Sequence, residues 1–191
     1  MKSLNWKEYL DYTHQLLTAD TPPPPYDNPD YYHYTKMNAT RMKRWLKTNP
    51  ITEETAGIVK AIDQPQDWVV ITEPWCGDAA HIVPILYLMS ALNERVNFTL
   101  QLRDSGSEID RYLTNGSRSI PVLIVRDRQG NDLFHWGPRP KEAQEMYLEL
   151  AARKADFETI KNAVQTYYNA DKSLSTQKEI AALLKEQVTV A

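Results

Sequence analysis

The chain has 191 residues, of which 42% are hydrophobic and 25% are charged. This length fits one globular domain, with or without an extension, and suffices to bury a core without disulfide bonds. The single cysteine excludes an internal disulfide framework and a cysteine-based structural zinc site. A net charge of −3 provides no overall positive field, so we expect no nucleic-acid partner.

The sequence predicts neither a secretory signal nor a membrane span. Residues 1–15 lack the apolar core that a signal peptide needs. The longest apolar stretch, residues 82–92, is about half the length of a membrane-spanning helix. We therefore expect a cytoplasmic protein that does not associate with membranes.

Residues 1–50 form a predicted N-terminal helical extension. A helix is expected over residues 1–18, because apolar residues recur there at helical spacing. Residues 19–30 contain five prolines and favour an extended linker. A second helix is predicted over residues 32–47, and a third follows over residues 53–62.

A different pattern begins at residue 67. The continuously apolar residues 68–71 are typical of a strand that is covered on both faces. The elements expected after it are a helix over 75–92 containing Pro84, a strand over 96–102, a short helix over 107–113, strands over 121–126 and 132–136, a long helical segment over 141–169 that breaks once, and a helix over 176–186 with Ser175 as its N-cap.

This order of elements predicts an α/β fold with a mixed central sheet of four or five strands and helices on both faces. The expected division is an N-terminal extension over 1–50, a main domain over 51–170 and a C-terminal helix over 171–191.

The sole cysteine, Cys76, lies where the first strand meets its helix. A thiol at a helix N-terminus faces unpaired backbone N–H groups and the positive end of the helix dipole. Both stabilise a thiolate, so the pKa of Cys76 is expected to fall below the usual value of about 8.5. The alternative is a buried structural cysteine without reactivity.

Four features resemble the thioredoxin family when taken in order. They are Trp75-Cys76-Gly77 after a buried strand, Pro84 in the following helix, Ile120-Pro121 opening a later strand, and Gly137 after the hairpin. The resemblance covers about residues 52–152 and implies a thioredoxin-like fold. A helical extension ahead of a Trp-Cys-Gly-Asp site is similar to a bacterial thioredoxin-like subgroup with little assigned function.

The resemblance implies roles for individual residues. Cys76 would be the attacking thiol, and Trp75 would pack beside it. Ile120 and Pro121 would form a cis-proline loop that pairs with the backbone of a substrate, although Pro121 could also be an ordinary strand-opening proline. Gly77 and Asp78 complete the predicted substrate-binding set.

Two departures from the family bear on mechanism. The second cysteine of the family's Cys-x-x-Cys motif is replaced by Ala79, so this chain cannot resolve a mixed disulfide internally. The buried acid that assists that step in thioredoxins would fall at Val70, which cannot transfer a proton.

Other side chains near the cysteine leave alternatives open. Asp78 either raises the pKa of the thiol through like charge or is simply an acid favoured at a helix N-terminus. Glu73 is either a proton acceptor or, as we expect, a solvated loop acid. His81 should not face the sulfur, and Arg139 could bind an anion. The basic residues of the stretch 36–47 most simply form a solvated helix face.

Two functional hypotheses follow. In the first, the protein is a monothiol oxidoreductase: Cys76 attacks a protein disulfide or mixed disulfide, and an external low-molecular-weight thiol acts as the co-substrate that resolves it. The alternative is a non-catalytic thioredoxin-fold module that binds a protein or peptide. Redox sensing through Cys76 is a third, weaker idea. No cofactor or metal is expected, and the oligomeric state stays open.

Overall fold

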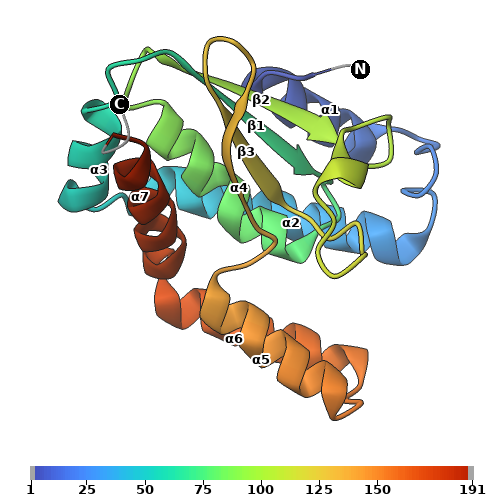
Figure 1. Cartoon of the computed structure of the whole chain (residues 1–191). Coiled ribbons are helices and arrows are strands. Elements are labelled where there is room, and N and C mark those ends of the chain that lie inside the picture. Colours follow the sequence, from blue (N-terminus) through green and yellow to red (C-terminus); the bar gives the residue numbers. More distant parts are fainter. Residues whose placement is uncertain (1–2, 189–191) are drawn as a thin grey trace.

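The computed structural model describes residues 3–188 and is built around a four-stranded sheet (Figure 1). The strands are β1 (Gln66–Thr72), β2 (Val96–Leu102), β3 (Val122–Arg126) and β4 (Asp132–Trp136), in the order β2-β1-β3-β4. β1 and β2 are parallel, whereas β3 runs antiparallel to both β1 and β4. The predicted α/β class with a mixed sheet is confirmed.

The connection between the two parallel strands is α4 (Gly77–Ser90). Ten of its residues are buried, which explains why its sequence is apolar on nearly every side. Pro84 lies inside this helix, as predicted. On the way from β2 to β3, the expected helix over 107–113 is reduced to one 3-10 turn, η1 (Ile109–Arg111), held against the sheet by an ion pair between Glu108 and Arg126 of β3.

Three helices precede the sheet: α1 (Trp6–Thr18), α2 (Pro29–Thr48) and α3 (Glu53–Lys60). α1 begins with a capping box, in which Asn5 and Glu8 satisfy each other's backbone N–H groups. α2 begins three residues before the predicted start, because Asn28 caps it and Pro29 occupies the first turn, where a missing N–H costs nothing.

The N-terminal helices fold back onto the sheet of the same chain. Leu4 forms an antiparallel bridge with Leu100 of β2, and the ring of Trp6 stacks on Tyr87 of α4 at 4.5 Å. α2 packs along α4, where Trp45 donates a hydrogen bond to His81 at 3.1 Å. Both helices therefore belong to the packed core.

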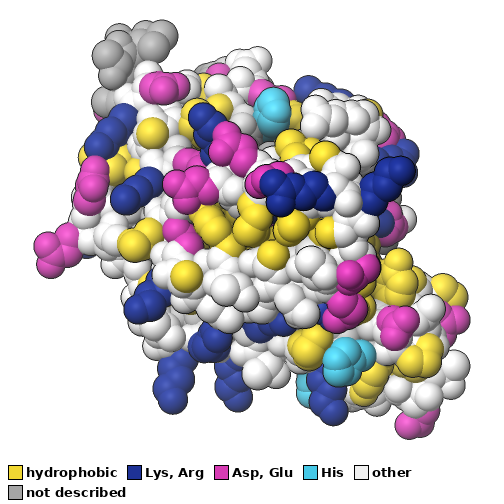
Figure 2. Space-filling view, turned by 90° about the horizontal axis from the view of Figure 1, so that it is seen from below, with side chains coloured by type: hydrophobic (Ala, Val, Ile, Leu, Met, Phe, Trp, Pro, Cys, Tyr) yellow, Lys and Arg dark blue, Asp and Glu magenta, His cyan; other side chains and the backbone are white. Residues whose placement is uncertain are grey.

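The long C-terminal segment breaks once, as expected, into α5 (Lys141–Ala152) and α6 (Phe157–Asp171). Figure 1 shows this hairpin below the sheet, and Figure 2, seen from that side, shows a band of hydrophobic side chains bordered by charged ones. Two large hydrophobic side chains of the hairpin, Leu148 and Phe157, are exposed. Within residues 3–188, no helix is both long and apolar enough to cross a bilayer.

The last helix, α7 (Leu174–Val188), begins before the predicted N-cap. Ser175 therefore lies inside the helix, and its N–H and hydroxyl both donate to the carboxylate of Asp171. Lys172 and Ser173 adopt positive φ and turn the chain between α6 and α7. The sequence has no glycine or proline at this left-handed turn, so it did not indicate where α6 ends and α7 begins.

Gly137 closes the sheet against the loop before β3. Its φ is +136°, and a Cβ built on it would lie 2.2 Å from the carbonyl oxygen of Pro121. Backbone atoms line this contact, so a side chain has no room to turn away.

We predict that Gly137→Ala destabilises the fold by roughly 2 kcal/mol or more, because it combines overpacking with an unfavourable φ. The free energy of unfolding in urea measures the effect. Gly57→Ala is the matched control: Gly57 lies exposed in α3 with open space around it, and this change should stabilise by about 0.5–1 kcal/mol. A Gly137→Ala protein as stable as the unmodified chain would contradict the close contact.

Candidate functional site

Cys76 sits at the N-cap of α4, directly opposite the loop before β3. Its side chain is 6% exposed, and its thiol donates a hydrogen bond to the carbonyl oxygen of Ile120 at 3.4 Å. The Ile120–Pro121 peptide bond is cis. The fold thus brings Cys76 to Ile120 and Pro121, although the cysteine precedes them by more than forty positions in the sequence.

The environment of Cys76 favours the thiol over the thiolate. Burial is the main cause that raises its pKa to about 12, and the negative charge of Asp78 acts in the same direction. The N–H groups of Ala79 and Asp78 and the charge of Arg139 lower the pKa by less. The expected pKa below 8.5 is therefore wrong: the helix N-terminus acts as predicted, but desolvation outweighs it.

Trp75 lies partly exposed between two side chains from other segments. The guanidinium of Arg103 sits 4.8 Å from the centre of its ring, and the ring of Tyr31 from α2 contacts it edge-on at 5.4 Å. The indole Nε1 is buried without a hydrogen-bond partner. Trp75, the residue before Cys76, therefore has a charged neighbour and an aromatic neighbour from other segments of the chain.

Glu73 is buried, which corrects the expectation of a solvated loop acid. Its two carboxylate oxygens accept hydrogen bonds from the hydroxyl of Tyr26 at 3.1 Å and the backbone N–H of Asp104 at 3.0 Å. Burial raises the pKa of Glu73, and these two donors offset part of the increase. Glu73 thus joins the proline-rich linker and the loop after β2 to the loop that carries the cysteine.

Pro74, the next residue of the loop, also accepts a hydrogen bond from the N-terminal segment. The side-chain amide of Asn38 in α2 donates to the carbonyl oxygen of Pro74 at 3.0 Å. Asn38 is buried, and its own carbonyl oxygen accepts from Arg41 at 2.9 Å. Residues 73–75 are therefore each contacted by the segment that runs from Tyr26 to Asn38.

Asp78 lies in the first turn of α4 and forms a buried ion pair with Arg139. The guanidinium donates from Nε to Oδ1 at 3.0 Å, and its Nη2 lies 2.7 Å from Oδ2. Tyr168 of α6 also donates a hydrogen bond to Oδ1, at 2.8 Å. The guanidinium of Arg139, for which the sequence left anion binding open, is thus engaged by a carboxylate of its own chain.

His81 does not join the cysteine. Its Nδ1 accepts from Trp45, its Nε2 lies 3.1 Å from Oε1 of Gln165, and its ring stacks on Tyr168 at 4.6 Å. Burial lowers the pKa of His81 to about 4, so the ring is neutral near pH 7. The basic residues of the 36–47 stretch are mostly exposed while Met42 and Trp45 are buried, as expected of a solvated helix face.

The positions of the missing resolving groups are filled by core side chains. Ala79 is 2% exposed and Val70 is completely buried. Within residues 3–188, no cluster of three or more His, Cys, Asp or Glu side chains could hold a metal ion.

Sequence reasoning missed three residues of the site: Tyr26, Asn38 and Tyr168 act through contacts 47, 36 and 90 positions away. Their local sequence carries no sign of these contacts. The one available signal was Glu73 itself, since an acid placed between a buried strand and Pro74 needs partners.

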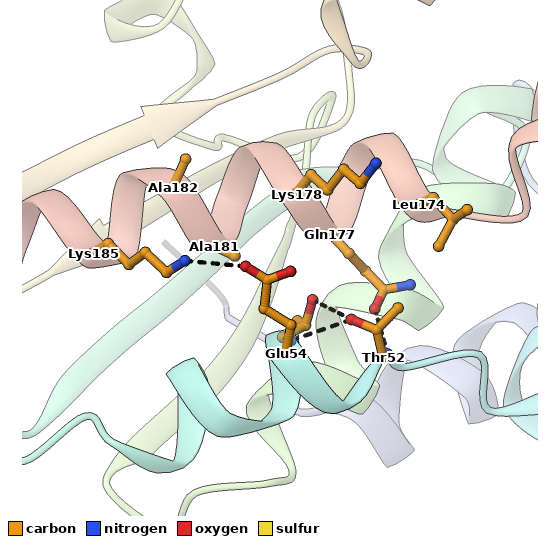
Figure 3. A pocket seen from close by; sticks show the side chains of 9 residues that line it. Thr52, Glu54, Leu174, Gln177, Lys178, Ala181, Ala182 and Lys185 are labelled. Atoms are coloured by element: carbon orange, nitrogen blue, oxygen red, sulfur yellow. Dashed lines mark hydrogen bonds and ion pairs between the residues drawn. The ribbon is translucent and has the colours of Figure 1, made fainter.

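Two hollows on the surface are lined by residues other than Cys76 and its neighbours. One of about 350 Å³ lies between α3 and α7 and is lined by Thr52, Leu174, Gln177 and Lys178 among others (Figure 3). Its polar groups are engaged with one another: Gln177 accepts from the N–H of Thr52, and Lys185 pairs with Glu54. None of the predicted site residues lines it.

The sheet order, the cysteine at the start of α4 and the facing cis-proline define a thioredoxin-like α/β protein. The family model described as Thioredoxin matches residues 25–184, and the chain therefore belongs to the thioredoxin family. The match is wider than the 52–152 span carried by the motifs and includes α2. Membership associates the protein with thiol–disulfide chemistry in general, and members of this family generally need no cofactor.

Two solved structures share the fold. A crystal structure of a protein of unknown function from Pseudomonas aeruginosa has 14% identity and a TM-score of 0.60, covering 96% of this chain and 99% of that one. The crystal structure of an HIV epitope-scaffold has 15% identity and a TM-score of 0.59, covering 82% and 90%. No curated protein matches this chain.

We predict that iodoacetamide alkylates folded Cys76 slowly, at a rate that still rises through pH 9 without a plateau. The reason is that the thiolate fraction grows tenfold per pH unit below the pKa, which burial raises to about 12. The same titration in urea is the control and should reach half its maximal rate near about pH 8.5 and level off about one pH unit higher. A plateau below pH 8.5 in the folded protein would show that the thiol is activated after all.

A second prediction concerns the anchor between the linker and the site. Tyr26→Phe should destabilise the fold by about 1–3 kcal/mol, because it leaves the buried carboxylate of Glu73 with one donor fewer. Tyr31→Phe is the matched control: Tyr31 contributes its ring to Trp75, and loss of its hydroxyl should cost less than about 0.5 kcal/mol. Equal urea midpoints for the two variants would contradict the assignment.

Proposed function

We propose that the protein carries out monothiol thiol–disulfide exchange through Cys76. The observation that carries this proposal is the hydrogen bond from the thiol to the carbonyl of Ile120, beside the cis-proline. This hydrogen bond directs the sulfur of Cys76, the single cysteine of the chain, toward the loop before β3. In the hypothesis from the sequence, the backbone of that loop pairs with a substrate. Family membership supports the same kind of chemistry.

The proposed cycle has two balanced steps. The Cys76 thiol loses its proton to solvent, and the thiolate attacks one sulfur of a disulfide; a Cys76–sulfur bond forms, the disulfide bond breaks, and a thiolate leaves. An external low-molecular-weight thiolate then attacks the mixed disulfide on the sulfur of the substrate. Cys76 leaves as a thiolate and takes up a proton again. Ala79 makes this external thiol necessary.

Burial sets the expected rate and the size of the substrate. A thiol with a raised pKa has a very small thiolate fraction near pH 7, so exchange should be slow. With the side chain 6% exposed and α2 packed over the neighbouring residues, a small disulfide reaches the sulfur more readily than a folded protein does. We therefore place low-molecular-weight and mixed disulfides ahead of intact protein disulfides.

A specific observation also favours the second candidate, a non-catalytic binding module. The polar groups of residues 73, 74, 76 and 78 are hydrogen-bonded within the chain, and burial keeps the sulfur protonated. In that reading Cys76 is a structural residue, and partners bind elsewhere on the fold. Cys76→Ser would then leave partner binding intact.

Mass spectrometry separates the two candidates. Folded protein incubated with oxidised glutathione at pH 9 should gain one glutathione adduct, which a reduced thiol removes, and Cys76→Ser should gain none. Absence of an adduct on the folded protein, while urea-unfolded protein forms one, would overturn the exchange proposal and favour the binding module.

Ala79→Cys tests the geometry of the same site. A second thiol three residues after Cys76 restores the family's spacing, so the variant should form an intramolecular disulfide and reduce insulin disulfides, which the unmodified chain should not do. Ala80→Cys is the matched control, since it buries a thiol of equal size at a spacing the family does not use. Equal activity of the two variants would argue against the assigned positions.

A further inference from the structure

Asp78, two residues after Cys76 in the first turn of α4, pairs through its carboxylate with Arg139 from the segment after β4. The charges of these two side chains shift the pKa of Cys76 in opposite directions. A charged sulfur would in turn raise the pKa of Tyr9 of α1, Arg103 after β2 and Tyr168 of α6. Because the carboxylate of Asp78 offsets the guanidinium of Arg139, this ion pair determines how much positive charge Arg139 contributes at the sulfur.

We propose that Arg139 is a latent partner of the Cys76 thiolate and that Asp78 keeps Cys76 unreactive by occupying that guanidinium. The inference rests on the proposed function in one respect, namely that Cys76 is the reacting group. Asp78 and Arg139 are here positioning residues, which act on the thiol through charge.

The geometry supports this assignment because the pair is enclosed. The side chains of Asp78 and Arg139 are only 11% and 14% exposed, so water screens them little. Arg139 is fixed on its other sides by Gln144, which accepts from Nη1 at 3.0 Å, and by the ring of Tyr147 at 4.2 Å. We therefore expect the guanidinium to stay in place if its bond to Asp78 is lost.

The ion pair determines the net charge of the site in each protonation state of Cys76. With the Cys76 thiol protonated, the carboxylate of Asp78 and the guanidinium of Arg139 sum to zero, and Arg103 is paired separately with the carboxylate of Asp104. Ionising the sulfur adds an uncompensated negative charge to a buried region, which is costly. If residue 78 is neutral, the same ionisation brings the local sum from +1 to zero. With the carboxylate present, the site is neutral when the sulfur is protonated. Without the carboxylate, the site is neutral when the sulfur is ionised.

The contributions to the pKa of Cys76 agree with this count. The charge of Asp78 raises that pKa and the charge of Arg139 lowers it, with burial as the largest cause. An opposite charge within about 4–6 Å of a titratable group shifts its pKa by about 1–3 units. Loss of the Asp78 charge removes one cause that raises the pKa of Cys76 and keeps the Arg139 charge that lowers it, so we expect that pKa to fall by about one unit.

The test is the rate of Cys76 alkylation by iodoacetamide at pH 7 in folded protein. Asp78→Asn should react about tenfold faster than the unmodified chain, because one pKa unit is a tenfold change in thiolate. The double variant Asp78→Asn with Arg139→Gln should lose that gain. Asp156→Asn is the matched control: it makes the same change at the N-cap of α6 and should react at the unmodified rate.

Two results would overturn the proposal. The first is an unchanged rate in folded Asp78→Asn. The second is a double variant as fast as Asp78→Asn, since then loosening of the site rather than the guanidinium would explain the gain. Urea midpoints report folding of each variant.

If Asp78→Asn does not fold, Arg139→Gln alone decides the question. The proposal requires a slower reaction and a pH profile displaced upward, whereas mere loosening would make the reaction faster. Alkylation reports the thiolate and not exchange, so a missing glutathione adduct would defeat the proposed function while leaving this result standing.

Discussion

The loop from Glu73 to Asp78 is largely buried, so most of its polar groups need partners from the rest of the chain, and much of the architecture follows from that constraint. The polar groups of Glu73, Pro74, Cys76 and Asp78 find partners on the linker before α2, α2 itself, the loop before β3, and the segments around α5 and α6, whereas the indole Nε1 of Trp75 has none. An unpaired carboxylate or carbonyl in such a place costs several kcal/mol. These contacts explain why helices outside the common thioredoxin core are packed so closely on the site.

The same constraint determines the state of the sulfur. In an exposed site, the N–H groups at the start of α4 would stabilise a thiolate. Here they still lower the pKa of Cys76, but the sulfur has lost its water, and a carboxylate stands two residues away. Desolvation of a full charge is the larger effect, so the position typical of a reactive cysteine holds a protonated one. Position on a fold and reactivity are separate properties.

Elements with a strong local pattern could be predicted from the sequence. β2 alternates apolar and polar residues and has the predicted bounds, and the apolar run of β1 marks a strand covered on both faces. The cis-proline loop opposite Cys76 followed from the family resemblance. By contrast, the start of α7 could not be predicted, because the turn before it uses Lys172 and Ser173 at positive φ instead of glycine.

The candidate site was predictable in its centre and not in its surroundings. Cys76, Trp75, Ile120 and Pro121 are adjacent to motifs, whereas the burial of Glu73 and the engagement of Arg139 depend on Tyr26 and Asp78, which are distant in sequence. Burial changes the role of both side chains. Glu73 is an internal anchor and not a solvated loop acid, and Arg139 is one half of an ion pair. Because a buried charge is stable only with its partner, the behaviour of Cys76 is set by Asp78 and Arg139 together and cannot be assigned to the cysteine alone.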